Sequence, residues 1–426
     1  MDEKEINSEL LKRITDHYLN STDFNGFVFN YDNKNPDLNP KQFREWVGGF
    51  IKRGELSLRY EEFHSNPYIR RMPDLEKDKD LEQLEKTKLN IVVAYPTPKV
   101  LKNAVEKEKY NGRPFSLRLA LGEAHMDYHC FDLSVLEFYR NEPRYYYSVD
   151  DVSGRIYMKN EYCQTTSVSN SDNIFLQTFG FAYDEDLNRY VAVYTWYLHT
   201  LSKEHQQIWE AKRVDRKYVI HPDYLNASAY GLFPDHVPAL VAFSSELDHI
   251  NEMCKLIGKP HLFNNVLEDK NKPRNFTLLI RPTSKEFSDF VLLLDQAMSD
   301  NINKDFFKDD LELEEEVQRQ DGKVEVRHKG TIALLKEWFE KYFEFEERKP
   351  FDEMIYTFKK VRKLRMKPAH CLIDNEFDQK FFKEQRELVK KAYSAVRLIR
   401  RILNGHPDCR DYKIRDVLSE GRIRYF

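Results

Sequence analysis

The strongest constraint on the fold is a series of helical apolar stripes in the last third of the chain. Apolar residues recur there every three or four positions in four separate segments. This spacing places them on one face of an α-helix. Four amphipathic helices predict an antiparallel bundle. Three of these helices are expected to start at Thr283, Thr331 and Pro350, the two threonines acting as caps. The last helix is expected to end at Gly405 and Pro407.

The preceding region, residues 1–270, has a different pattern. Short apolar and alternating segments are separated by turn-forming residues, which predicts a mainly antiparallel sheet with flanking helices. Residues 235–257 predict a further helix, and the Lys/Asn/Pro-rich stretch 269–275 predicts a linker. The fold class is therefore α+β, with an N-terminal α+β region, which can hold two subdomains, and an all-helical domain at 283–426. The expected strands are Phe115–Leu121, Tyr145–Val149, Arg155–Lys159, Ile174–Tyr183 and Tyr190–Tyr197.

Charge is distributed unevenly along the chain. The net charge is −4, but residues 351–426 contain 19 Lys and Arg against 11 Asp and Glu, a balance of +8. Residues 1–350 contain 48 against 60, a balance of −12. Only the C-terminal segment has the sign that a polyanionic partner requires. Solvated helix faces explain the same charge, so both interpretations stay open.

Several protein classes are disfavoured by composition. The chain has no run of 18 apolar residues and begins with charged residues, so neither a membrane span nor a secretory signal is expected. Its five cysteines are odd in number and far apart, which predicts a reducing cytoplasm rather than a disulfide framework or a zinc finger. Phosphate-loop, dinucleotide, nucleophile-elbow and zinc-protease motifs do not occur, and no cofactor is expected.

One arginine stands out on the third helical stripe. Arg365 continues the inward positions of Phe358 and Val361, and a buried guanidinium requires either a partner or a functional role. Pro368 disfavours helix at the residue before it. His370 then follows about one turn later, so Arg365 and His370 are expected to lie close together at a helix junction.

The Arg-x4-His element at this place in a four-helix pattern resembles the HEPN superfamily, over about residues 283–426. The resemblance implies a homodimer in which two motifs face one another and form a composite, metal-independent endoribonuclease site. Arg365 would then hold the scissile phosphate, and His370 would transfer a proton as the 2′-hydroxyl attacks phosphorus. Bidentate phosphate binding and proton transfer near neutrality suit these side chains.

Three further cations surround the motif and are expected to assist RNA binding: Arg362, Lys363 and Lys367. Active HEPN nucleases usually carry a polar residue after the arginine, whereas this chain has Met366. Either Lys367 supplies the missing contact or activity is weak or absent. The alternatives are therefore a catalytically inactive HEPN module that binds RNA or protein, and a bundle that serves only to dimerise.

Two histidines in the N-terminal region have metal-like spacing. His125 and His129 form an H-x3-H pair, which on a helix can bind zinc. Because no third ligand is evident in the sequence, two partly exposed structural histidines are favoured.

The leading interpretation is a cytoplasmic, metal-independent endoribonuclease of a toxin or anti-phage defence type. It is expected to act on RNA as a homodimer, without a membrane. The size of residues 1–270 suggests that this region senses a ligand or a regulatory protein and controls the C-terminal domain.

Overall fold

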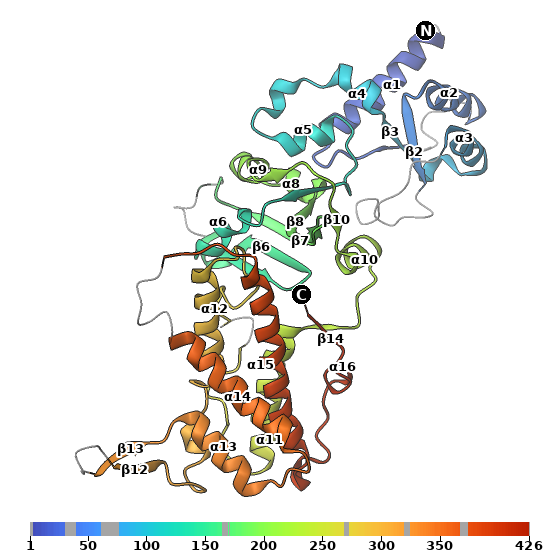
Figure 1. The fold of residues 1–426 in the computed structure, drawn as a ribbon. Helices are drawn as coiled ribbons and strands as arrows, with labels where there is room; N and C mark the ends of the chain where they lie inside the picture. The colour runs from blue at the N-terminus through green and yellow to red at the C-terminus, as the bar shows by residue number, and fades with distance from the viewer. Residues whose placement is uncertain are drawn as a thin grey trace. The chain divides into compact units, whose positions relative to one another are not determined.

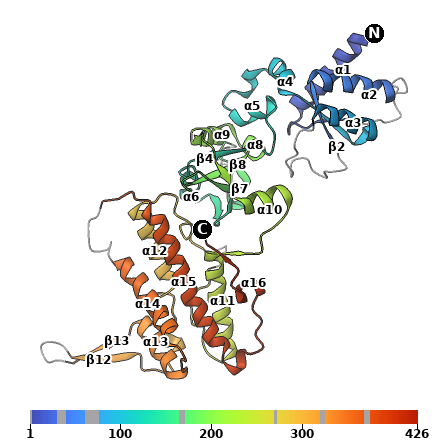
Figure 2. The same cartoon turned by 45° about the vertical axis from the view of Figure 1, so that its right-hand side comes forward.

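The fold is α+β in the computed structural model of the chain (Figure 1). As expected, a strand-rich part comes before a largely helical part, and Figure 2 shows the same elements from a second direction. The structure describes residues 3–29, 40–60, 76–163, 169, 171–267, 272–318, 324–366 and 374–425.

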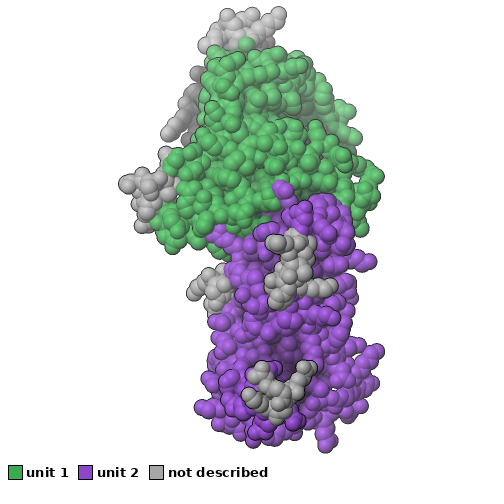
Figure 3. Space-filling view, turned by 60° about the vertical axis from the view of Figure 1, so that its left-hand side comes forward, with its two compact units in different colours: residues 1–147, 153–233 green, residues 148–152, 234–426 purple. Residues whose placement is uncertain are grey.

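The chain divides into two compact units, coloured in Figure 3. Unit 1 comprises residues 1–147 and 153–233, and unit 2 comprises residues 148–152 and 234–426. The boundary therefore lies earlier than the expected linker near residue 270. The reason is α11 (Ala239–Leu256), which packs most extensively against α15 (Lys380–Asn404) and so belongs with the C-terminal helices.

The first part of unit 1 is a small three-stranded sheet in the order β1-β3-β2, with both strand pairs antiparallel. Alternation along β2 buries Leu56, Leu58 and Tyr60 and leaves the intervening residues partly exposed, the period-2 pattern of a half-buried strand. The elements are α1 (Glu3–Asn20), β1 (Phe27–Val28), α2 (Pro40–Arg53), β2 (Leu56–Tyr60), α3 (Lys77–Lys86) and β3 (Val92–Pro96).

The second part of unit 1 is a seven-stranded sheet in the order β5-β6-β7-β8-β4-β9, with β10 paired to β7. The pairs β6–β7, β7–β8, β4–β8, β4–β9 and β7–β10 are antiparallel, as the sequence predicts. The strands are β4 (Tyr128–Phe131), β5 (Tyr145–Val149), β6 (Ser153–Met158), β7 (Phe175–Tyr183), β8 (Arg189–Tyr194), β9 (Arg213–Val214) and β10 (Val219–Ile220).

Helices flank this sheet, and one of them replaces an expected strand. Phe115–Leu121 was predicted as a strand, but residues Pro114–Ala120 form α5. Pro114 lies in the first turn, where its fixed φ favours a helix, and Phe115 and Leu119 are buried on one side. The helices are α5 (Pro114–Ala120), α6 (Val135–Asn141), α7 (Asn160–Cys163), α8 (Thr195–His199), α9 (Lys203–Glu210) and α10 (Pro222–Tyr230). The preceding helix α4 (Pro98–Ala104) instead contacts α1 and β3 of the first part.

Two further details of unit 1 concern strand and helix ends. The strand expected over Tyr190–Tyr197 stops at Tyr194, because α8 begins at Thr195. Gly180 of β7 lies directly beneath α10: a Cβ built there would come within 2.2 Å of the Tyr224 ring. The helix approaches the sheet this closely because glycine has no side chain.

Unit 2 is a helical bundle with one apolar core, in which α14 contacts α12 and α15, and α15 contacts α11 (Figure 1). The four expected helices are present. Thr283 caps α12 by accepting a hydrogen bond from the Glu286 amide at 3.2 Å. The helices not yet named are α12 (Ser284–Ala297), α13 (Thr331–Tyr342), α14 (Arg348–Met366) and α16 (Asp416–Ser419).

Two local features of unit 2 concern a hairpin and a helix start. The acidic residues of β12 (Glu314–Gln318) pair with β13 (Val324–His328) in a largely exposed hairpin. Thr331 is the first residue of α13 rather than its cap, and its hydroxyl instead donates to the Ser299 carbonyl at 2.8 Å.

The C-terminal segment is tied back into unit 2. Strand β14 (Ile423–Arg424) pairs in parallel with β11 (Val237–Pro238). Arg424 also forms a two-pronged ion pair with Asp151, with Nε–Oδ2 and Nη2–Oδ1 distances of 2.6 and 3.0 Å. Asp151 is 3% exposed at its side chain, so this pair is largely sheltered from water.

Candidate functional site

The predicted arginine lies in the last turn of α14, directly before the helix ends at Met366. Its neighbours Phe358 and Val361 are fully buried, which confirms the inward direction of the stripe. Lys367 and His370 lie outside the described residues, so their positions relative to Arg365 stay a prediction.

Two carboxylates of unit 2 hold this arginine. Asp295, in the last turn of α12, accepts a hydrogen bond from Arg365 Nη1 at 2.8 Å. Asp300, just beyond α12, is the second partner of the same Nη1 atom. Arg362, one turn earlier on α14, places Nε 2.8 Å from Asp295 Oδ2 and Nη2 2.6 Å from Asp300 Oδ1. We refer to Asp295, Asp300, Arg362 and Arg365 as the Arg–Asp quartet.

Burial within the quartet is uneven. The Asp295 side chain is completely buried, whereas Arg362 and Arg365 are each 33% exposed. Hydrogen bonds to Asp295 and then to Asp300 raise the pKa of Arg365 above its ordinary value, so Arg365 keeps its charge at any working pH. The guanidinium groups compensate the buried carboxylate, and the carboxylate in turn fixes their orientation.

Arg365 retains hydrogen-bonding capacity despite these contacts. Both of its carboxylate contacts use Nη1. Within the described part of the chain, its Nε and Nη2 groups have no acceptor. A partly exposed guanidinium with free donors can bind an oxyanion such as phosphate. Lys363 on the same turn is exposed and adds positive charge beside it.

The sequence identified the arginines but not their acidic partners. Asp295 and Arg365 are 70 positions apart, and no local pattern links residues at that separation. One signal was present: Asp295 directly follows Leu294, a position on the inward stripe of α12. A carboxylate beside a buried stripe needs a cationic partner, just as Arg365 does.

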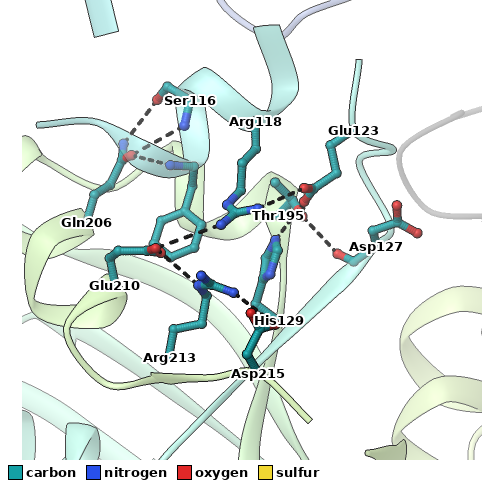
Figure 4. Close-up of polar contacts among 11 residues, drawn as sticks. Ser116, Arg118, Glu123, Asp127, His129, Thr195, Gln206, Glu210, Arg213 and Asp215 are labelled. Carbon is teal, nitrogen blue, oxygen red and sulfur yellow. Dashed lines mark hydrogen bonds and ion pairs between the residues drawn. The ribbon is translucent and has the colours of Figure 1, made fainter. Parts of the chain in front are cut away.

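A second polar network occurs in unit 1 and includes one of the two histidines singled out by spacing (Figure 4). His129 Nε2 lies 2.6 Å from Glu123 Oε1, which also accepts a hydrogen bond from the Thr195 hydroxyl at 2.5 Å. Burial alone would raise the pKa of Glu123, but the bonds from His129 and Thr195 lower it. His125 instead has its Nε2 3.0 Å from the Asp23 carbonyl oxygen, so the two histidines do not act as a pair.

The same network extends through a chain of ion pairs. Arg118 lies 3.6 Å from Glu123 and 3.8 Å from Glu210, and Glu210 lies 3.1 Å from Arg213. These residues tie α5 and α9 to β9, as Figure 4 shows. The charges of these side chains compensate one another, while Arg118 Nε and Glu210 Oε2 are buried without a hydrogen-bond partner among the described residues. We interpret this network as structural.

Among the described side chains, no group of three His, Cys, Asp or Glu residues is arranged to hold a metal ion. Among the helices that the structure describes, none combines the length and the apolar composition needed to cross a bilayer.

Comparison with known proteins does not assign a family. No family model, curated protein or solved structure matches this chain significantly.

Proposed function

We propose that unit 2 is a metal-independent endoribonuclease of the HEPN type. The observation that supports this best is Arg365: it sits at the end of α14, is held by a buried carboxylate, and keeps free donors on Nε and Nη2. A preorganised cation of this kind can stabilise charge that develops on a phosphate in the transition state.

In the proposed reaction, the 2′-hydroxyl of a ribose attacks the adjacent phosphorus and displaces the 5′-oxygen of the next nucleotide. Arg365 binds the non-bridging phosphate oxygens, and His370 carries a proton to or from the reacting oxygens. The products are a 2′,3′-cyclic phosphate and a free 5′-hydroxyl. Arg362, Lys363 and Lys367 assist by attracting the RNA backbone.

The wider proposal concerns assembly and control. Two copies of unit 2 would pair as a homodimer and bring two copies of Arg365 and His370 to one site. Unit 1 would respond to a ligand or a regulatory protein, and the whole would act in the cytoplasm as a toxin or defence effector.

A non-catalytic HEPN module that binds RNA or protein is the second candidate, and one specific observation favours it. The two carboxylates of the Arg–Asp quartet balance the two guanidinium charges. Together with Met366 after the arginine, this lowers the positive potential available to a scissile phosphate. In that case the quartet would serve the packing of α12 against α14.

The test is RNA cleavage in excess EDTA by the wild type, Arg365→Ala and His370→Ala. We expect the wild type to cleave and both variants to lose at least about 100-fold in rate, the usual range for removing a transition-state donor or an acid–base group. Lys359→Ala is the matched control, because Lys359 is an exposed cation on the same helix, and it should cleave at close to the wild-type rate.

Other outcomes separate the candidates. Undiminished cleavage by both variants, or cleavage that EDTA abolishes, contradicts the nuclease proposal. Salt-sensitive RNA binding without cleavage favours the non-catalytic module. Because Arg365→Ala removes one partner of Asp295, Arg365→Lys should be assayed beside it, with thermal melts to confirm that each variant is folded.

A further inference from the structure

A groove of about 670 Å³ runs between α14 and α15 within unit 2, and neither sequence motif uses it. Apolar atoms of Met354, Ala395 and Leu398 contribute to its lining. Its rim is polar and charged. The remaining lining residues are Pro350, Glu353, Tyr356, Thr357, Glu387, Lys390, Lys391, Ser394, Arg397 and Arg401.

The charge of this groove is positive, with four cations against the two carboxylates Glu353 and Glu387. All four cations come from α15. Lys390, Lys391 and Arg401 are exposed, and they form no ion pair with any described carboxylate. Arg397 differs, because its Nη2 donates to the Ser419 carbonyl at 3.1 Å.

The spacing of these cations suits a linear partner. Residues 390, 397 and 401 are separated by seven and four positions, so they recur on one face of the helix. At 1.5 Å rise per residue they span roughly 16 Å along α15. Lys390 also approaches the ring of Tyr425, at 5.9 Å from its centroid, a contact that leaves its charge uncompensated.

The opposite wall adds an aromatic side chain. Tyr356 of α14 lines the groove and is 60% exposed, unlike the buried Met354 and Phe358 on the same helix. An exposed ring beside a row of cations is the combination that binds single-stranded nucleic acid, because any base can stack on the ring while the phosphates meet the cations.

The face of α14 that carries Tyr356 has further cations beyond the groove. Lys360 and Lys363 follow Tyr356 at four and seven positions, so they continue its face toward the C-terminal end of the helix. Lys363 is exposed and Lys360 partly buried. Arg365, nine positions after Tyr356, lies on the opposite face, where it pairs with Asp295 of α12.

We infer that the α14–α15 groove binds the backbone of single-stranded RNA, with Tyr356 stacking on a base. The inference rests on the proposed function and assigns it a binding surface separate from the catalytic residues. An acidic polypeptide could meet the same cations, but it would not require the exposed ring.

The experiment measures fluorescence anisotropy of a labelled 20-nucleotide poly(U) RNA with full-length protein over a range of salt. The His370→Ala background prevents cleavage. Lys390→Glu/Lys391→Glu should weaken binding at least tenfold and lower the salt slope by about two. Tyr356→Ala should weaken it several-fold, while Tyr356→Phe retains the wild-type affinity. The control is the double variant Lys304→Glu/Lys308→Glu, which makes the same change of charge at two exposed lysines of unit 2 outside the groove. It should have little effect on RNA affinity.

Failure of this inference can be told from failure of the proposed function. If RNA is bound and cleaved but the groove and control double variants behave alike, only the groove assignment is overturned. Displacement of RNA by poly-glutamate at equal charge, with Tyr356→Ala unchanged, overturns it in favour of an acidic protein partner. Absence of RNA binding by the His370→Ala protein itself, and of cleavage by the wild type, overturns both proposals.

Discussion

At the scale of single residues, the Arg–Asp quartet joins α12 to α14 through the buried carboxylate of Asp295 and the guanidinium groups of Arg362 and Arg365. The inward direction of Arg365 follows from helical periodicity alone. The identity of its partners does not, because Asp295 lies on another helix and becomes a neighbour only when α12 packs against α14. Sequence therefore predicts the need for a partner, and tertiary packing supplies it.

The quartet predicts non-additive stability. Arg362→Ala and Arg365→Ala should each lower the free energy of unfolding by about 1 kcal/mol, because the remaining arginine still pairs with the buried Asp295. The double variant should cost about 3–5 kcal/mol, since it leaves a buried carboxylate without a partner. Urea denaturation, monitored by the circular dichroism of the helices, measures the free energy of unfolding of each variant. Adding Asp295→Asn to the double variant should restore part of the loss. Strictly additive costs would contradict the shared role of Asp295.

His199 predicts a pH-dependent stability of unit 1. Burial, and then the charge of His125, lowers the pKa of His199 to about 4, and its Nε2 has no hydrogen-bond partner among the described residues. Between pH 6.5 and 4 the unfolded chain therefore binds a proton that the folded chain does not. The contribution of His199 to the free energy of unfolding is fully present above pH 6.5 and is lost as the pH falls toward 4. The loss should be about 2 kcal/mol, after allowance for the partial solvent exposure of the ring.

The ring of His199 lies between those of Phe24 and Trp196, with centroid distances of 5.5 and 4.9 Å. The variant His199→Phe keeps an aromatic ring at this place, but that ring cannot titrate. Its unfolding free energy should fall less steeply than that of the wild type between pH 6.5 and 4, measured by urea denaturation at each pH. Parallel pH profiles for the two proteins would show that His199 does not contribute.

At the scale of elements, long periodic segments were predicted well and short ones were not. α12 and α15 carry several turns of consistent apolar spacing, so no other structure buries those residues. Phe115-Ser-Leu-Arg-Leu119 alternates over only five residues, which fits a strand as well as one face of α5. The β12–β13 hairpin depends on cross-strand pairs such as Glu315 opposite Arg327, which an acidic stretch does not reveal by itself.

The start of α12 offers a test of local sequence control. The Thr283 hydroxyl accepts from the Glu286 amide, and Glu286 in turn accepts from the Ile280 amide at 2.9 Å. Thr283→Ala should lower the stability of unit 2 by about 1 kcal/mol, because a helix N–H loses its acceptor. Ser288→Ala, inside the same helix, should be neutral or slightly stabilising, since its hydroxyl only bonds back to the Ser284 carbonyl. Chemical denaturation of both variants measures these changes in stability, and an equal loss of stability in the two variants would contradict the expectation.

At the scale of the whole molecule, unit 2 is assembled from two separate stretches of chain. The shorter stretch, residues 148–152, comprises the end of β5 and the turn before β6, yet Asp151 pairs with Arg424. A sequence-based boundary near 270 could not have anticipated this, because domain assignment from composition assumes that each domain is one continuous stretch.

The Asp151–Arg424 pair should hold strand β14 in place. Asp151→Ala removes the buried carboxylate that pairs with Arg424 and should lower local stability by about 2–3 kcal/mol. The Val237 amide donates to the Arg422 carbonyl at 3.0 Å, so hydrogen exchange at Val237 should accelerate by about 30–100-fold. Glu420→Ala removes an exposed partner of Arg422 and should leave that exchange rate nearly unchanged. Equal exchange in both variants would indicate that β11–β14 pairing suffices alone.

The separation of Asp151 from Arg424 by 273 residues also sets an order of events on the ribosome. At roughly 5–20 residues per second, about 15–55 s pass between the synthesis of one partner and the other. Unit 1 can complete its sheet once residue 233 has left the exit tunnel. Unit 2 must wait for β14, with α11 and its apolar face exposed in the nascent chain meanwhile. If unit 2 does cleave RNA, this delay would keep the site unfinished until β14 has been synthesised.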